Sequence, residues 1–197
     1  MCNDYEQHVQ AAAYRRALEA LDLAGSGGDE EALGWADDVR IGDKGPVLRA
    51  AGNGVQLVSM TFGFPPPRPK AAPVFNFKSD GRDFSESRRC VIVLSGFYEF
   101  TGSRYPKTKH RFALTDGAVM GIAGLWSEAD DGAQSFTMLT CPPGPDIAPV
   151  HDRQVCVLRP EDWAAWLFLT RPQAQLLRPL PAGTLSVTVV RQGKDEQ

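Results

Sequence analysis

The chain has 197 residues, of which 43% are hydrophobic and 23% are charged, and its formal net charge is −3. These proportions are typical of a globular protein and exclude a disordered chain or a generally basic nucleic-acid coat, while the length fits one domain over residues 1–197. No apolar run is long enough to cross a bilayer, and residues 1–10 lack the apolar core of a secretory signal. We therefore expect a cytoplasmic protein that does not contact membranes.

The distribution of charges and cysteines indicates which classes of ligand the chain could bind. Residues 1–43 carry ten acidic and three basic side chains, whereas residues 68–111 carry ten Lys or Arg and four acidic side chains. The basic segment permits a phosphate-binding face, although a solvated lysine-rich loop would have the same composition. The four cysteines form no CxxC pair and the three histidines are scattered, so we expect no metal and no other cofactor.

The first predicted element is a helix that begins at Asp4, where Gln7 completes a capping box, and continues to Gly25. Small and polar residues then predict connections over residues 25–31 and 42–54. Short runs that are apolar or alternating, several of them rich in β-branched residues, predict seven strands: Val55–Phe62, Cys90–Phe100, Arg111–Leu114, Val119–Trp126, Ser135–Thr140, Val155–Leu158 and Leu185–Val190.

Turn sequences at residues 115–117 and 130–132 favour antiparallel hairpins over helical crossovers. A late helix is predicted from Pro160, where acidic residues and then two tryptophans on one face follow. Five prolines within residues 64–73 favour a rigid loop over a PxxP ligand. These elements predict an α+β fold of mainly antiparallel strands with flanking helices.

Cys2 is the first candidate for chemistry. A small second residue permits removal of Met1, which leaves an α-amine and a thiol on one residue. An α-amine with a pKa of about 8 is partly unprotonated near neutral pH and attacks an aldehyde to give a Schiff base, and the thiol then closes a five-membered thiazolidine. A helix beginning at Asp4 would lower the pKa of this thiol. The alternative is a cysteine with no role.

Three further residues have side chains that can orient an aldehyde and move protons. Asn76 lies between aromatic residues after the proline-rich segment, Glu99 lies between two aromatic residues at the end of a predicted strand, and His151 precedes Asp152. Each has a structural alternative: a turn residue, a salt-bridged edge residue and a structural histidine.

Residues 1–2, 76–80, 96–100 and 150–153 occur in the order and approximate spacing of the SOS response-associated peptidase (SRAP) family, which the chain resembles over nearly its whole length. The resemblance implies an α+β fold of curved antiparallel strands. It also implies covalent capture of abasic sites in single-stranded DNA as a thiazolidine and self-catalysed removal of Met1. The Schiff-base chemistry would also give weak strand-cleaving lyase activity. We expect a monomer.

The resemblance assigns roles to the four candidates. Cys2 would be the nucleophile, Asn76 would orient the N-terminus and the aldehyde, and Glu99 would bind or deprotonate the amine. His151 would relay a proton during opening of the sugar ring and reversal of the crosslink.

The resemblance also implies DNA contacts, through aromatic stacking and cation–phosphate pairing, which suit a channel that tolerates any sequence. These contacts map onto Phe62, Lys78, Phe100, Thr140 and Arg153. The chain departs from the family pattern at Asp4 and Lys78, where arginine is usual, and at Phe62 and Phe100, where tryptophan is common.

Two other functions use the same residues. The first is an amidohydrolase or peptidase whose N-terminal cysteine attacks a substrate other than DNA, with Asn76 as an oxyanion donor. The second is a DNA-binding module in which Cys2 takes no part. An aldehyde trap leaves a stable adduct on Cys2, a hydrolase releases product, and a binding module is indifferent to Cys2→Ala.

Overall fold

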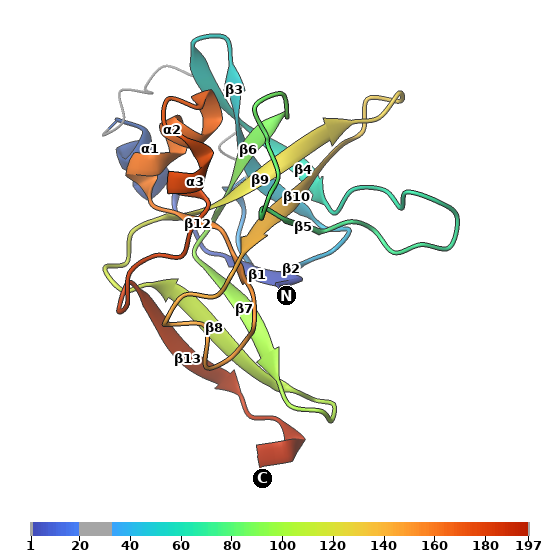
Figure 1. Ribbon diagram of the computed structural model, residues 1–197, viewed down its shortest axis with the longest axis vertical. Helices are drawn as coiled ribbons and strands as arrows, with labels where there is room; N and C mark the ends of the chain where they lie inside the picture. The colour runs from blue at the N-terminus through green and yellow to red at the C-terminus, as the bar shows by residue number, and fades with distance from the viewer. Residues whose placement is uncertain (1, 20–32, 197) are drawn as a thin grey trace.

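A computed structural model describes residues 2–19 and 33–196 (Figure 1). The first of its two sheets has the strand order β13-β8-β7-β1-β2 and forms the lower part of the molecule in Figure 1. All of its pairings are antiparallel. Its strands are β1 (Asp4–Gln7), β2 (Ala36–Arg40), β7 (Gly96–Thr101), β8 (Thr108–Leu114) and β13 (Leu185–Arg191).

The second sheet has the order β11-β10-β4-β3-β6-β9-β12, with β5 paired to β10. Because β10 pairs with both β4 and β9, five strands close into a ring of β4, β3, β6, β9 and β10. Only β4–β10 and β5–β10 are parallel among the pairings described. The strands are β3 (Lys44–Ala51), β4 (Gly54–Phe62), β5 (Asn76–Lys78), β6 (Arg89–Leu94), β9 (Met120–Glu128), β10 (Gln134–Cys141), β11 (Gln154–Val155) and β12 (Val157–Leu158). The α+β fold of curved, mainly antiparallel strands is therefore confirmed.

Three helices gather on one side of the ring: α1 (Ala11–Glu19), α2 (Pro160–Phe168) and α3 (Gln173–Leu176) (Figure 1). Pro160 opens α2 as predicted, since its missing N–H leaves no helical bond unmade at that position. Trp163 and Trp166 of α2 are fully buried, and the indole N–H of Trp166 donates to the Cys90 carbonyl at 2.9 Å. No helix in the described part of the chain is long and apolar enough to cross a membrane.

Alternate residues of the ring strands pack into two separate hydrophobic cores. Leu48 and Val91 pack with the helices, whereas their neighbours Val47 and Ile92 point to the opposite side, as the two-residue period of a strand requires. The second core holds stacked aromatic pairs whose ring centroids lie 5.1 Å apart (Phe62–Phe136) and 5.2 Å apart (Phe97–Phe112). Cys2 belongs to this second core, so the fold buries the candidate nucleophile against aromatic residues.

Two N-terminal predictions were wrong. Residues 4–7 form β1 rather than the first turn of a helix, because they pair with both β2 and β7, and α1 begins only at Ala11. Residues 44–51 form β3 rather than a connection, and Pro46 is tolerated because it precedes the residues that pair with β6. The end of the predicted first helix and the predicted connection over residues 25–31 lie outside the described residues.

Other predicted elements are confirmed with changed boundaries. The run 90–100 contains two strands in different sheets, β6 and β7, separated by Ser95. The turn at 130–132 closes the β9–β10 hairpin, whereas the turn at 115–117 connects strands of different sheets.

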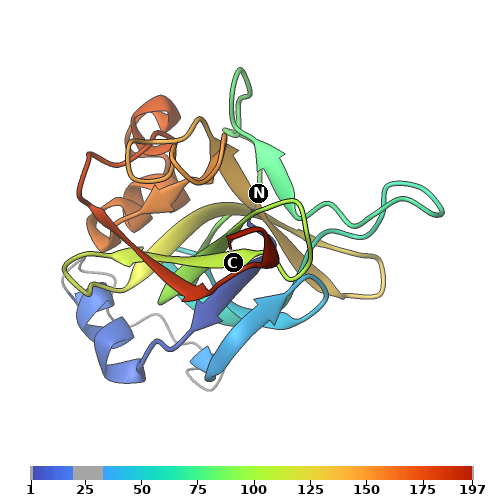
Figure 2. The ribbon, with the colours of Figure 1, turned by 90° about the horizontal axis from the view of Figure 1, so that it is seen from below.

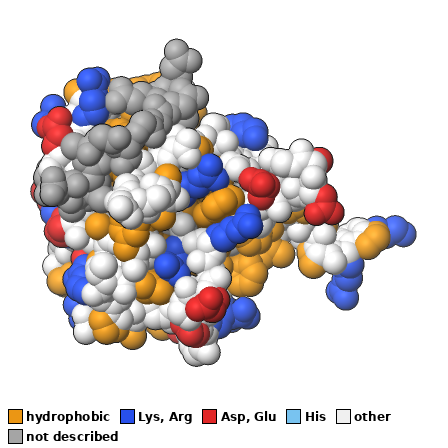
Figure 3. Space-filling model, turned by 90° about the horizontal axis from the view of Figure 1, so that it is seen from above, with side chains coloured by type: hydrophobic (Ala, Val, Ile, Leu, Met, Phe, Trp, Pro, Cys, Tyr) orange, Lys and Arg blue, Asp and Glu red, His pale blue; other side chains and the backbone are white. Residues whose placement is uncertain are grey.

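The proline-rich loop over residues 64–73 projects from the body with basic side chains at its tip (Figures 1, 2 and 3). A bridge between Phe64 and Val74 fixes its base.

Gly121 on β9 tests the packing of α2 on the ring. A Cβ atom at this position would meet the indole of Trp163 and would lie 2.6 Å from Cγ1 of Val91. We expect Gly121→Ala to lower the free energy of unfolding by about 1–3 kcal/mol, because neither neighbour can withdraw from a packed core. Urea denaturation measures this loss. The control Ser127→Ala, on the same strand, should stay within about 0.5 kcal/mol of wild type, and equal stability of both variants would contradict the packing.

Candidate active site

Cys2 is held by hydrogen bonds from two directions. Its side chain is 1% exposed, and its Sγ donates to the Asp4 carbonyl at 3.3 Å. The side-chain amide of Asn76 donates to the Cys2 carbonyl at 2.8 Å. Asn76 reaches this position because the short strand β5 aligns in parallel with β10. The structure thus brings Cys2 and Asn76 together, although 74 residues separate them.

The carboxyl group of Glu99 lies beside the backbone N–H of Cys2. Strand β1 runs antiparallel to β7, which sets Cys2 beside the end of β7 where Glu99 stands. Burial raises the pKa of Glu99 to about 7, although a hydrogen bond from the Cys2 backbone N–H opposes the rise. The carboxyl is 1% exposed. A carboxyl group with this pKa can both accept and donate a proton near neutral pH.

His151 completes the constellation. Its Nε2 lies 3.8 Å from Oε2 of Glu99, and its Nδ1 accepts the backbone N–H of Arg153 at 3.1 Å. Burial lowers the pKa of His151, and the nearby Asp152 carboxylate is 90% exposed, so solvent screens its opposing effect. Burial favours the neutral ring, whose Nε2 faces Glu99, while Nδ1 contacts both the Arg153 N–H and, at 2.9 Å, Oδ1 of Asp152.

The expected activation of the thiol by a helix was wrong. Burial raises the pKa of the Cys2 thiol far above its ordinary value, and the charge of Glu99 raises it further. No helix begins near Asp4 to oppose this effect, because residues 4–7 form a strand. The thiol is protonated in this arrangement.

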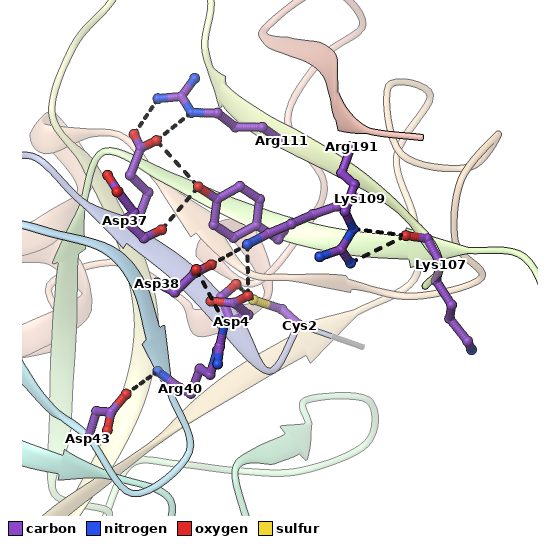
Figure 4. A network of polar contacts seen from close by, with 12 residues as sticks. Cys2, Asp4, Asp37, Asp38, Arg40, Asp43, Lys107, Lys109, Arg111 and Arg191 are labelled. Carbon is purple, nitrogen blue, oxygen red and sulfur yellow. Dashed lines mark hydrogen bonds and ion pairs between the residues drawn. The ribbon is translucent and has the colours of Figure 1, made fainter. Parts of the chain in front are cut away.

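A buried lysine that sequence reasoning missed stands beside the site. Lys109 on β8 is 8% exposed, and its Nζ lies 2.9 Å from Oδ2 of Asp4 and contacts Asp38 (Figure 4). It also lies 3.5 Å from the centroid of the Tyr98 ring. Burial raises the pKa of Asp4 to about 6; burial acts in the same sense on Asp38, but hydrogen bonding and charge from Lys109 lower its pKa overall. The family pattern has arginine at the position of Asp4. Here Lys109, from another strand, supplies a positive charge beside that position.

Three of the five predicted DNA contacts lie where a ligand can reach them. Lys78 is exposed at the end of β5, and Phe100 lines the cavity described below. Arg153 is partly exposed and pairs with Asp80 at 2.6 Å. Its guanidinium also donates to the carbonyl of Thr140 at 2.8 Å.

The other two predicted DNA contacts, Phe62 and Thr140, are buried. Phe62 is 0% exposed, and its ring stacks on Phe136 inside the core. Thr140 is 1% exposed, and it supports Arg153 through its carbonyl and hydroxyl oxygens. Aromatic or polar residue type alone did not reveal that both side chains face inward.

A cavity of about 610 Å³ opens beside these residues. Glu99 and His151 lie in its wall together with Asn3 and Asp4, and its other walls come from β2, the end of β7, β8 and the C-terminal strand. Among the described residues, no group of three or more His, Cys, Asp or Glu is arranged to hold a metal ion. The site combines the Cys2 thiol with an amide on the Cys2 carbonyl, a buried carboxyl and an imidazole beside that carboxyl.

The titration of Glu99 is directly measurable. Because burial holds its pKa at about 7, well above the ordinary glutamate value of about 4.3, we expect one glutamate carboxyl to titrate with a midpoint near pH 7. Carbon-13 NMR of side-chain-labelled glutamate measures the midpoint, and Glu99→Gln should remove this resonance alone. Midpoints below about 5 for all glutamates would contradict the buried placement of the carboxyl.

Comparison with known proteins identifies the family of the chain. The family model described as SOS response associated peptidase (SRAP) matches residues 1–193. The abasic site processing protein YMR114C of Saccharomyces cerevisiae is 30% identical over 103 residues, a match that covers 48% of this chain and 28% of the yeast protein.

Solved structures share the fold. A protein from Bordetella bronchiseptica superposes with a TM-score of 0.71 at 22% identity, covering 96% of this chain and 100% of that one. A Bacteroides thetaiotaomicron protein gives 0.71 at 16% identity, covering 96% and 92%. A second Bordetella bronchiseptica structure, of a phage-related protein, gives 0.70 at 21%, covering 97% and 95%. With the family model matching residues 1–193, the chain belongs to the SRAP family.

Proposed function

We propose that this protein captures abasic sites in single-stranded DNA by forming a thiazolidine with Cys2 after Met1 is removed. The observation that carries the proposal is the meeting of two contacts at Cys2: Asn76 donates to its carbonyl at 2.8 Å, and its backbone N–H lies against the buried Glu99 carboxyl. Removal of Met1 turns this N–H into an α-amine already placed on a proton acceptor. Family membership and the name of the yeast relative, an abasic site processing protein, support the same substrate.

The chemistry begins with the amine. Glu99 takes a proton from the α-ammonium group, and the free amine attacks C1′ of the ring-opened abasic sugar to give a carbinolamine. Loss of one water molecule gives an imine. Asn76 keeps the Cys2 carbonyl in place at 2.8 Å, so the amine stays oriented during both steps.

The thiol reacts second. The Cys2 thiol is protonated while it is buried beside Glu99, whereas protonation of the imine places a positive charge next to Sγ and favours the thiolate. The thiol proton passes to the imine nitrogen, sulfur bonds to the imine carbon, and the C=N bond becomes a single bond, so the thiazolidine nitrogen keeps the proton that the thiol lost. The raised thiol pKa therefore delays addition until the imine has formed.

His151 serves proton transfer. Its Nε2 is 3.8 Å from Oε2 of Glu99, a separation that shortens to a hydrogen bond with a small movement of either side chain. In the proposal His151 relays a proton to O4′ of the sugar during ring opening and reverses the transfer when the crosslink reverts. Elimination from the imine intermediate gives the proposed weak lyase activity.

The DNA strand is held by exposed groups around the cavity. Lys78 and Arg153 pair with phosphates, and Phe100 stacks on a base. As parts of the same proposal, the protein removes its own Met1, acts as a single-domain monomer in the cytoplasm, and serves the response to DNA damage.

Denaturing gel electrophoresis with a single-stranded oligonucleotide carrying one abasic site tests the proposal. We expect a shifted band with wild type, no band with Cys2→Ala, and no band with an oligonucleotide lacking the lesion. Cys2→Ser keeps the amine but lacks the thiol, so its adduct should survive denaturation only after borohydride reduction of the imine.

Two outcomes would contradict the proposal. A shifted band that persists unchanged in Cys2→Ala would assign the adduct to another residue. Absence of a band, when intact mass shows that Met1 is gone, would remove aldehyde capture and would favour a hydrolase that releases its product.

A further inference from the structure

The outer part of the cavity differs chemically from its inner part. The inner part holds the buried acids Glu99 and Asp4, whereas the outer part is lined by Tyr105, Lys107 and Arg191. The Tyr105 side chain is 82% exposed, and its ring contacts no other aromatic ring among the described residues. An open aromatic face therefore stands at the mouth of the candidate active site.

The loop that carries Tyr105 is fixed from both sides. Asp195 accepts the backbone N–H of Arg104 at 2.8 Å and that of Ser103, and the backbone N–H of Lys194 donates to the Pro106 carbonyl at 3.1 Å. The guanidinium of Arg191 donates twice to the carbonyl of Lys107, at 3.3 and 3.4 Å (Figure 4). The C-terminal turn lies against the end of the β7–β8 hairpin as a result.

This bracing matters for binding. A ring on a loop held by five hydrogen bonds loses little further freedom when a ligand stacks on it, so more of the stacking energy appears as affinity. Exposure of Tyr105 is thus a property of an ordered surface.

The cations beside Tyr105 are available to an anion. Neither Lys107 nor Arg191 has an ion-pair partner among the residues that the structure describes, and Figure 4 shows the Lys107 side chain extending away from the buried cluster. An open aromatic face with two unpaired cations matches the two parts of a nucleotide, since a base stacks on the ring and a phosphate pairs with the cations.

We propose that Tyr105, Lys107 and Arg191 form a binding platform for a nucleotide of the single strand that flanks the lesion. The inference rests on the proposed function and extends it, because it assigns a binding role to the β7–β8 loop, outside the group of residues that hold Cys2. The platform directs the strand along β7, from Tyr105 past Phe100 toward Glu99.

Fluorescence anisotropy with a labelled single-stranded oligonucleotide that lacks any lesion measures the platform without the chemistry. We expect Tyr105→Ala to weaken binding roughly 10-fold, the effect of losing one stacked base, and Tyr105→Phe to stay within about 2-fold of wild type. Trp35→Ala is the matched control: Trp35 is 68% exposed but does not line the cavity, so binding should stay at the wild-type level.

The salt dependence tests the phosphate contact separately. Lys107→Gln should reduce the slope of log affinity against log salt by about 0.7, the value for one phosphate on a single strand. Equal binding by Tyr105→Ala and wild type, or an unchanged slope in Lys107→Gln, would overturn the platform.

The two proposals fail in different ways. If wild type crosslinks to abasic DNA but Tyr105→Ala binds the oligonucleotide as tightly as wild type, the platform is wrong and the proposed chemistry stands. If binding depends on Tyr105 but wild type forms no crosslink, the platform stands as a single-strand site and the proposed chemistry is wrong.

Discussion

The site depends on two hydrogen bonds that hold the backbone of Cys2, one from its N–H to the Glu99 carboxyl and one from Asn76 to its carbonyl. They fix the nitrogen and leave the sulfur against the aromatic core. Each bond needs its own long-range pairing: β1 must lie antiparallel to β7, and β5 must lie parallel to β10. The two sheets therefore bring side chains from distant segments together at Cys2: Asn76 contacts its carbonyl, and His151 lies 3.8 Å from the Glu99 carboxyl.

Burial sets the electrostatics of this arrangement. It raises the pKa of Glu99 to about 7 and raises the pKa of the Cys2 thiol far above its ordinary value, so the carboxyl titrates near neutral pH while the thiol stays protonated. The ammonium group of Lys109 lies between Asp4 and Asp38, where it pairs with two acids of the inner cavity. Lys107 and Arg191, which have no ion-pair partner in the described part of the chain, lie toward solvent, where the proposal places the DNA strand. An acidic protein can thus present a basic rim around an acidic interior.

Most strands and helix α2 could be predicted from short stretches of the sequence. Alternation and β-branched residues located most strands, and Pro160 with the acids after it located α2, because these signals act within a few residues. Asp4 and Gln7 wrongly predicted a helix, because these residue types are compatible with both a capping box and a strand. Only the pairing of residues 4–7 with β2 and β7 selects the strand. Phe62 is an inward-facing core residue, which its type does not reveal. Lys109 was missed because its partner Asp38 is 71 residues away.

The central claim is that the nitrogen and the sulfur of Cys2 both bond to one carbon of the abasic sugar. Tandem mass spectrometry of the crosslinked protein, digested to peptides after treatment with iodoacetamide, tests this most directly. The account predicts a sugar remnant on the peptide that begins at Cys2, with Met1 absent and the Cys2 sulfur protected from alkylation. A remnant on a lysine such as Lys78 or Lys109, with the Cys2 sulfur alkylated, would contradict it.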